Sequence, residues 1–282
     1  PMTELQWNQI ADTMKQYERT NNTTLDATKP IVIRLDMRAG GSFVRGLEKP
    51  WDNAFTQAMS ATAQKLAEQV QGAQLAYVGS DEITLLLFNN SEKEHFTPFF
   101  NGKLQKIVSI TAAMATAEFN KKWLGLIETE ENLERKELLQ SKLFCACFDS
   151  RAFNIDGDVR DALLSVWWRV TDVARNSVQM LARHHFSQKQ LNGIGTKEML
   201  IKLESIGHHW DDEVTSENKY GNIFIREAYV GEGYNPKTKE TVKTIRHAWF
   251  PSSEEQMREF RNMNNIEQIT ATQIYKRLME RG

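Results

Sequence analysis

The segment Ile31-Val32-Ile33-Arg34-Leu35-Asp36 decides how this chain folds, because it is an apolar run, rich in β-branched residues, that stops on a carboxylate. A second segment, Tyr77-Val78-Gly79-Ser80-Asp81-Glu82, also ends on acids and leads directly into the apolar run Ile83–Phe88. Short apolar runs bounded by turn residues predict buried strands. A carboxylate beside a sheet core is costly unless a cation or donor compensates it. The two acidic strand ends therefore indicate one shared polar site.

Outward from these segments, the chain alternates between strand-like and helix-like periods. We expect strands at 31–38, 75–78, 83–88 and 142–148, with helices at 52–70, beginning at the N-cap Asp52, and at 103–123. This β-α-β-β-α-β order predicts an α+β fold with a ferredoxin-like palm domain of the polymerase and cyclase type. The charged insert 128–140 is expected to be a solvated helix or loop.

Three regions follow from this pattern. Residues 1–29 form an N-terminal helix and loop, 30–155 the palm-like catalytic domain, and 156–282 a helical and β-hairpin region for RNA binding and oligomer contacts. In the last region we expect helices at 161–186 and 197–206, and a hairpin pairing 222–229 with 241–249. The end of the chain, 254–282, is polar with some helical periodicity.

Composition limits the classes of function. The net charge of −2 gives no global basic field, so a nucleic-acid partner would have to use local patches. No run reaches the roughly 18 apolar residues of a membrane span, and no signal peptide precedes the first helix. The two cysteines, Cys145 and Cys147, are too close on one predicted strand for a disulfide and too few for zinc. We expect buried strand cysteines in a soluble, cytoplasmic protein.

The acids Asp36 and Asp81 come together if the layout is correct, because the end of the first strand and the turn between the middle strands meet at one sheet edge. Such carboxylates could hold two Mg²⁺ with an open side for triphosphate oxygens, and the Met37 carbonyl could add a ligand. Glu82 would point away in a strand but could reach the site from a tight turn. The alternative, acids that merely cap strand ends in a surface turn, stays open.

A triphosphate needs further partners. The small residues Ala39-Gly40-Gly41-Ser42 after Asp36 would let backbone N–H groups approach a phosphate. Candidate cations are Arg34, Arg38, Lys49, Lys103, Lys106 and Arg151. Most surface lysines are simply solvated, whereas Arg151 follows the end of an apolar strand near the same sheet. Arg169 and Asp172 have the spacing of a structural ion pair. The doublets His184-His185 and His208-His209 are expected at interfaces or in solvent, since neighbouring residues diverge.

Several ordered motifs together resemble the tRNA(His) guanylyltransferase superfamily of 3′→5′ polymerases, most closely its bacterial and phage branch. The matching segments are Arg34–Arg38, Gly46–Asp52, Gly79–Glu82, Lys106–Ser109, Phe148–Arg151 and Trp168–Ser177. The resemblance implies two Mg²⁺ held by Asp36, Asp81 and the Met37 carbonyl, with Glu82 also catalytic. It further implies a tRNA substrate, ATP or GTP as activator of the tRNA 5′ end, attack by the 3′-hydroxyl of an incoming nucleotide, and a homotetramer built as a dimer of dimers.

The resemblance and the cations above give two candidate sets. The nucleotide-binding set is Arg34, Met37, Arg38, Ala39, Gly40, Gly41, Ser42, Phe43, Lys49, Ser80, Lys106 and Asn176. The RNA-binding set is Lys103, Arg151, Arg175, Arg183 and Lys189.

Two departures from the family pattern matter. Met37 stands where the family usually has glycine, before Ala39-Gly40-Gly41 in place of a polar-aromatic stretch, which leaves backbone coordination intact but could alter the base pocket. Ala174–Ser177 lacks the histidine of the eukaryotic branch, which favours template-dependent repair of tRNA 5′ ends over G addition to tRNA(His). The remaining alternatives are a palm-type nucleotide cyclase and an inactive RNA-binding relative.

Overall fold

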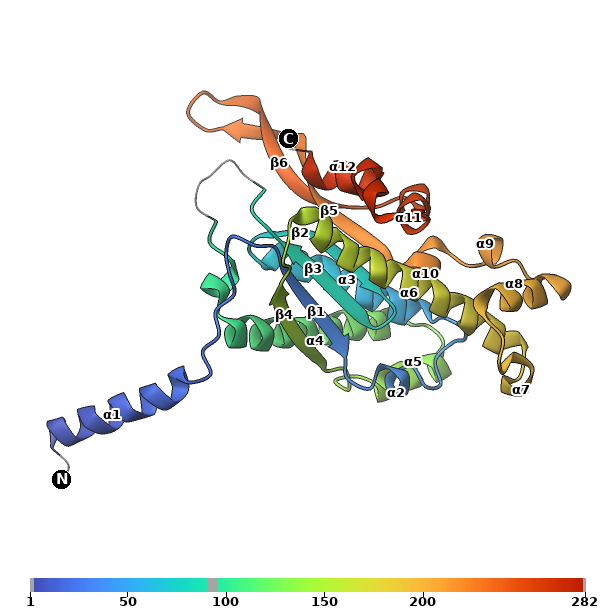
Figure 1. The fold of residues 1–282 in the computed structure, drawn as a ribbon, viewed down its shortest axis with the longest axis horizontal. Helices are drawn as coiled ribbons and strands as arrows, with labels where there is room; N and C mark the ends of the chain where they lie inside the picture. The colour runs from blue at the N-terminus through green and yellow to red at the C-terminus, as the bar shows by residue number, and fades with distance from the viewer. Residues whose placement is uncertain (1–2, 91–95, 281–282) are drawn as a thin grey trace.

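One six-stranded antiparallel sheet organises the chain, in the order β4-β1-β3-β2-β5-β6 (Figure 1). The computed structural model describes residues 3–90 and 96–280. The strands are β1 (Ile31–Met37), β2 (Ala73–Gly79), β3 (Glu82–Leu87), β4 (Phe148–Asn154), β5 (Asn222–Asn235) and β6 (Glu240–Pro251). The first four have the 4-1-3-2 order of a ferredoxin-like sheet. The predicted α+β class and βαββαβ order are confirmed.

Helices cover both faces of this sheet and extend beyond it. They are α1 (Glu4–Arg19), α2 (Gly40–Phe43), α3 (Asn53–Gln69), α4 (Leu104–Thr129), α5 (Leu133–Ser141), α6 (Val159–His185), α7 (Gln188–Leu191), α8 (Thr196–Ser205), α9 (Trp210–Glu213), α10 (Ser216–Tyr220), α11 (Glu254–Arg261) and α12 (Gln273–Met279), with short 3₁₀ turns η1 (Phe99–Gly102) and η2 (Ile266–Ala271). No helix in the described part of the chain is both long and apolar enough to span a membrane.

The alternation of β1 separates two cores. Ile31, Ile33, Leu35 and Met37 point to one face, where α3 and α4 pack in the larger cluster. Val32 points to the other face, where α6 packs, and this face also receives Arg34 and Asp36. The strand thus puts its apolar set on one side and its charged set on the other.

The C-terminal hairpin continues the same sheet. β5 pairs with β2, from Leu75↔Ile225 to Val78↔Asn222, and then with β6 over twelve pairs. The hairpin is longer than the predicted 222–229 and 241–249, and Figure 1 shows its far end projecting from the body. Because its base belongs to the central sheet, the predicted regions 30–155 and 156–282 share one sheet.

The predicted strand 142–148 is wrong, because β4 begins where that strand was expected to end. Lys142 instead caps the end of α5, and its ammonium donates to the carbonyls of Phe43 and Arg45, at 2.5 and 2.7 Å. The apolar alternation that suggested a strand belongs to a connecting turn. Cys145 and Cys147 lie in this turn and are exposed free thiols, so their predicted burial in a strand is also wrong.

The insert 128–140 covers the end of α4 and most of α5 and is mainly exposed, as predicted for a solvated helix, but Leu139 and Arg135 contact the body. Leu139 is buried, and its carbonyl accepts a 2.9 Å hydrogen bond from Trp123 Nε1. Arg135 forms a 2.9 Å ion pair with Asp52, which is the N-cap of α3 as predicted. Burial alone would raise the pKa of Asp52, but hydrogen bonds from Arg135 and from backbone N–H groups hold it below its usual value.

Candidate active site

The two acidic strand ends lie together, as the predicted layout requires. Asp36, near the end of β1, is paired in register with Glu82 on β3 and with Asp149 on β4. Asp81 lies beside them in the two-residue turn between β2 and β3, where its carbonyl accepts a 3.0 Å hydrogen bond from the Met37 N–H. Four carboxylates thus meet at one end of the sheet.

This crowding shapes the electrostatics of Asp36. Partial burial raises the pKa of its carboxyl, and the negative charges of Asp81, Glu82 and Asp149 raise it further, against an opposing effect of Arg151. Within the described residues no hydrogen bond reaches the Asp36 carboxylate. A cation at this position would relieve the repulsion that the protein leaves uncompensated.

Glu82 points to the same face as Asp36, because directly paired residues share a face of the sheet. Its carboxylate lies 3.4 Å from the Arg34 guanidinium and 2.7 Å from that of Arg169 on α6. Arg169 also approaches Asp172 at 3.4 Å, so the predicted 169–172 ion pair is present and forms part of a larger network. The charged network fixes Glu82 next to Asp36 from across the helix–sheet interface.

The loop after Asp36 comes into close contact with Asp81. Ala39 adopts a left-handed conformation and α2 begins at Gly40, where a Cβ atom would lie 2.1 Å from Asp81 Oδ2. A side chain at this position would displace the Asp81 carboxylate from where it lies. The side chains of Met37 and Phe43 are buried in the core, Phe43 with its ring centroid 5.0 Å from that of Trp123. These two predicted nucleotide-binding residues can therefore offer a ligand only their backbone.

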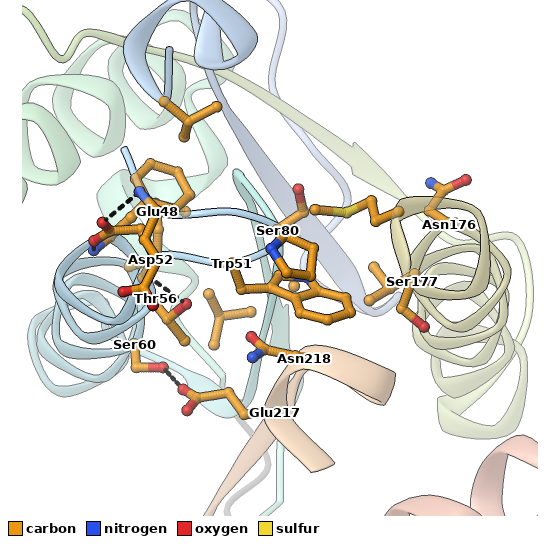
Figure 2. A pocket seen from close by; sticks show the side chains of 18 of the residues that line it. Glu48, Trp51, Asp52, Thr56, Ser60, Ser80, Asn176, Ser177, Glu217 and Asn218 are labelled. Carbon is orange, nitrogen blue, oxygen red and sulfur yellow. Dashed lines mark hydrogen bonds between the residues drawn. The ribbon is translucent and has the colours of Figure 1, made fainter. Parts of the chain in front are cut away.

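A cavity of about 130 Å³ opens beside the turn that carries Asp81 (Figure 2). Its apolar walls include Trp51, Phe55 and Val173, and it receives three of the predicted nucleotide-binding residues, Lys49, Ser80 and Asn176. In Figure 2 Asn176 projects from α6, while Glu217 reaches across to a hydrogen bond with Ser60.

Sequence reasoning missed part of this cavity. Trp51 stands in a quoted motif directly after Lys49-Pro50, so an aromatic wall could have been suspected. No sequence pattern pointed to Glu217 and Asn218. They reach the cavity because α10 leads directly into β5, where the chain rejoins the central sheet.

The remaining predicted residues lie at differing distances from the acids. Arg38, Ser42, Arg151 and Arg175 are exposed on elements that reach the site, and Gly41 has open space around it. Lys103 and Lys106 lie at the opposite end of the sheet, since Lys103 pairs with Thr24, and the nearby Asp26 N–H donates to Asn154, the register partner of Ile31. Five strand residues, about 17 Å, separate that end from Asp36. Arg183 and Lys189 lie beyond the sheet, on the last turn of α6 and on α7.

The donor set suits a hard cation. In the described ranges no three His, Cys, Asp or Glu side chains are arranged as metal ligands. His185 stacks on His208 at 3.7 Å between ring centroids, but this pair likewise forms no such group. Two carboxylates and a backbone carbonyl offer oxygen donors only, which Mg²⁺ prefers over softer metals. Asp36, Asp81 and the Met37 carbonyl therefore fit the predicted metal in chemistry.

Comparisons with known proteins identify the relatives of this chain. Residues 11–156 match the family described as tRNAHis guanylyltransferase. A bacterial tRNA(His) guanylyltransferase (Thg1)-like protein in complex with ATP is 30% identical, with a TM-score of 0.67 over 84% of this chain and 91% of that chain. The same kind of protein in complex with GTP is 28% identical, with a TM-score of 0.65 over 90% and 100%. An uncharacterized protein of Acanthamoeba polyphaga mimivirus is 28% identical over 226 residues, 77% of each chain.

The fold, its acidic sheet end and these relatives define the class of protein: a nucleotidyltransferase. The chain belongs to the tRNAHis guanylyltransferase family, whose members act on tRNA.

Proposed function

We propose that this protein adds nucleotides in the 3′→5′ direction to the 5′ end of tRNA, in template-dependent repair, with G addition to tRNA(His) as a possible special case. ATP or GTP first activates the 5′ end, and the 3′-hydroxyl of an incoming nucleotide then attacks it. The observation that carries this proposal is the meeting of Asp36 and Asp81 at one sheet end, next to a cavity bordered by Lys49, Ser80 and Asn176.

The protein's own residues have distinct tasks in this scheme. Trp51 and Asn176 border the cavity that we assign to the nucleoside. Relatives bound to ATP and to GTP support the binding of a nucleotide by this chain. The backbone after Asp36 approaches phosphates, because the first N–H groups of a helix lack intrahelical partners. Arg34 and Arg169 hold Glu82 in place and keep its charge beside Asp36. The resulting negative site is suited to cations and to the phosphates that they bind.

Asp36, Asp81 and the Met37 carbonyl would hold two Mg²⁺. When bound, these ions lower the pKa of an attacking hydroxyl and stabilise charge on a leaving phosphate. Binding would also relieve the repulsion that raises the pKa of Asp36 in the protein alone.

The proposed assembly is a homotetramer, a dimer of dimers. The predicted roles of Lys103 and Lys106 require it, because within one chain they lie at the far end of the sheet and would reach an active site only in another subunit. The exposed thiols of Cys145 and Cys147 suit the reducing cytoplasm.

The test is incubation of 5′-labelled, 5′-truncated tRNA with ATP, nucleoside triphosphates and Mg²⁺, with Asp81→Ala as the control. We expect extension at the 5′ end that matches the opposite strand, and none with the variant. Cyclic nucleotide formed without RNA would instead support a cyclase. RNA binding without any product would identify an inactive relative.

A further inference from the structure

Trp168 on α6 is an exposed aromatic side chain in an otherwise charged setting. It is 54% exposed, whereas its neighbour Trp167 packs inward and donates a hydrogen bond to the Arg261 carbonyl. The guanidinium of Arg169 lies 4.7 Å from the Trp168 ring centroid, and that of Arg34 lies 5.9 Å away. The carboxylate of Glu82 contacts both guanidiniums and holds them beside the ring. Two cations therefore support the indole, and about half of the residue stays exposed to solvent.

The position of Trp168 relates it to the proposed active site. Trp168, Asp172 and Asn176 follow one another at intervals of four residues, on one side of α6. Eight helical residues correspond to about 12 Å. Asn176 and Ser80 border the cavity at one end of this stretch. At the other end Glu82, two residues after Ser80 and the register partner of Asp36, contacts Arg169, the neighbour of Trp168. The acids Asp81 and Glu82 therefore lie between the cavity and Trp168.

Cations and a further aromatic ring surround Trp168. Arg151 is the register partner of Arg34 on the edge strand β4, and Phe153, two residues on, shares its face and is 37% exposed. Arg175 is exposed and follows Trp168 by seven residues, about two turns along the same side of α6. Aromatic rings beside guanidinium groups are how proteins hold unpaired nucleic-acid ends, through base stacking and phosphate contacts.

We propose that Trp168 is a stacking platform for the 5′-terminal base of the RNA substrate. This inference rests on the proposed function, which places the RNA 5′ phosphate at the acids and the incoming nucleotide in the cavity. The base attached to that phosphate then lies on the side away from the cavity, where the exposed indole of Trp168 is. Arg34 and Arg169 hold the ring from behind, and Arg151 lies beside the RNA backbone.

The experiment is a cycle between protein and RNA variants. Binding of 5′-truncated tRNA, with either an intact or an abasic 5′-terminal nucleotide, is measured by fluorescence anisotropy. The proteins are wild type, Trp168→Ala, Trp168→Phe and Trp7→Ala, the last a control with a similarly exposed tryptophan (60%) on the remote helix α1. We expect Trp168→Ala to weaken binding of intact RNA about tenfold, within the range of base–aromatic stacking, and to leave abasic RNA unaffected. Trp168→Phe should restore most of the loss, and Trp7→Ala should match wild type.

Three results would overturn the platform. Wild type could bind abasic and intact RNA equally, a result that needs no variant and so does not depend on the folding of one. Trp168→Ala could weaken both RNAs alike, as a structural residue would. It could also raise the KM for the nucleoside triphosphate while RNA affinity stays unchanged, in which case the ring serves the incoming nucleotide.

Failure of the proposed function gives a different pattern. Wild type that discriminates abasic RNA but extends no 5′ end would retain the platform and contradict the polymerase. Extension together with equal binding of the two RNAs would contradict only the platform. Absence of RNA binding by wild type would contradict both.

Discussion

The two faces of the central sheet differ in what they do with charge, although the same strand supplies both. Toward α3 and α4, β1 presents Ile33, Leu35 and Met37, each at most 2% exposed, in the larger core. Toward α6 it presents Arg34 and Asp36, which lie among other charged groups. Both faces carry a packed core, but the α6 face also has an uncompensated negative end. The difference indicates that the first face maintains the fold, while the second both maintains the fold and is shaped for a charged ligand.

Two buried or half-buried carboxylates show the same contrast. Asp52, at the start of α3, is satisfied by Arg135 and by backbone donors, and the pKa of its carboxyl is low. Asp36 has charged neighbours of its own sign, and its pKa is high. A structural acid is thus compensated within the chain, while an acid intended for a ligand is left for that ligand to compensate.

The largest expected effect is on the α6 face. Asp36→Asn should lower 5′-extension activity by about 10³-fold or more, because it removes charge stabilisation from the reacting centre. Its melting temperature in metal-free buffer should be unchanged or a few degrees higher. The sign follows from the raised pKa: the ionised carboxylate costs stability at every pH above its folded pKa, and asparagine removes that cost.

Activity assays with excess Mg²⁺ and thermal melts with a chelator measure the two effects of Asp36→Asn separately. A melting temperature well below wild type in the chelator would make Asp36 a structural residue and would break the contrast between the faces.

The adjacent residue gives the opposite result. Leu35→Ala should lower the free energy of unfolding by about 3 kcal/mol, since Leu35 is 1% exposed in the α3–α4 core and its removal leaves a cavity. Urea denaturation measures this loss. The activity per folded molecule should stay close to wild type, because Leu35 points away from the acids. Loss of activity in fully folded Leu35→Ala protein would show that the two faces are coupled.

The sequence predicted much of this division and missed parts that depend on packing. The apolar, β-branched run Ile31–Asp36 was enough to predict a buried strand, but not that its two faces differ, and strand order placed Asp81 beside Asp36. The apolar run 142–148 was misassigned because periodicity cannot distinguish a strand from a turn whose residues are held by a distant contact, here Lys142 with Phe43.

Long-range contacts explain the other gaps at the site. The direction of Glu82 was left open between a strand that points it away and a tight turn that brings it to the site. The sheet register turns it to the side of Asp36, where Arg169 reaches it from α6. The ion pair of Arg169 with Asp172 was predicted, but its contact with Glu82 was not, since sequence spacing reveals neighbours on a helix but not across an interface. The roles of these residues in catalysis stay predictions.

The smallest expected effect sharpens the contrast between the two acids. Asp52→Asn keeps a side chain able to cap α3 but loses the ionic contact with Arg135, which should cost about 1–2 kcal/mol near neutral pH.

The pH dependence follows from the depressed pKa of Asp52 in the folded protein. The ionised Asp52 carboxylate stabilises the fold above the ordinary aspartate pKa of about 3.9, and this stabilisation is lost as pH falls through the lower folded pKa. The urea midpoints of wild type and Asp52→Asn should therefore converge only at a pH below the folded pKa of Asp52. For Asp36→Asn the shift in urea midpoint should have the opposite sign. That shift should fade at a higher pH than the shift for Asp52→Asn, as pH falls through the raised pKa of Asp36.

Arg135→Met is the matched control, since in its background Asp52→Asn should cost less if the ion pair is the source. An undiminished cost in that background would assign the effect to the helix cap, and Asp52 would no longer serve as the compensated counterpart of Asp36.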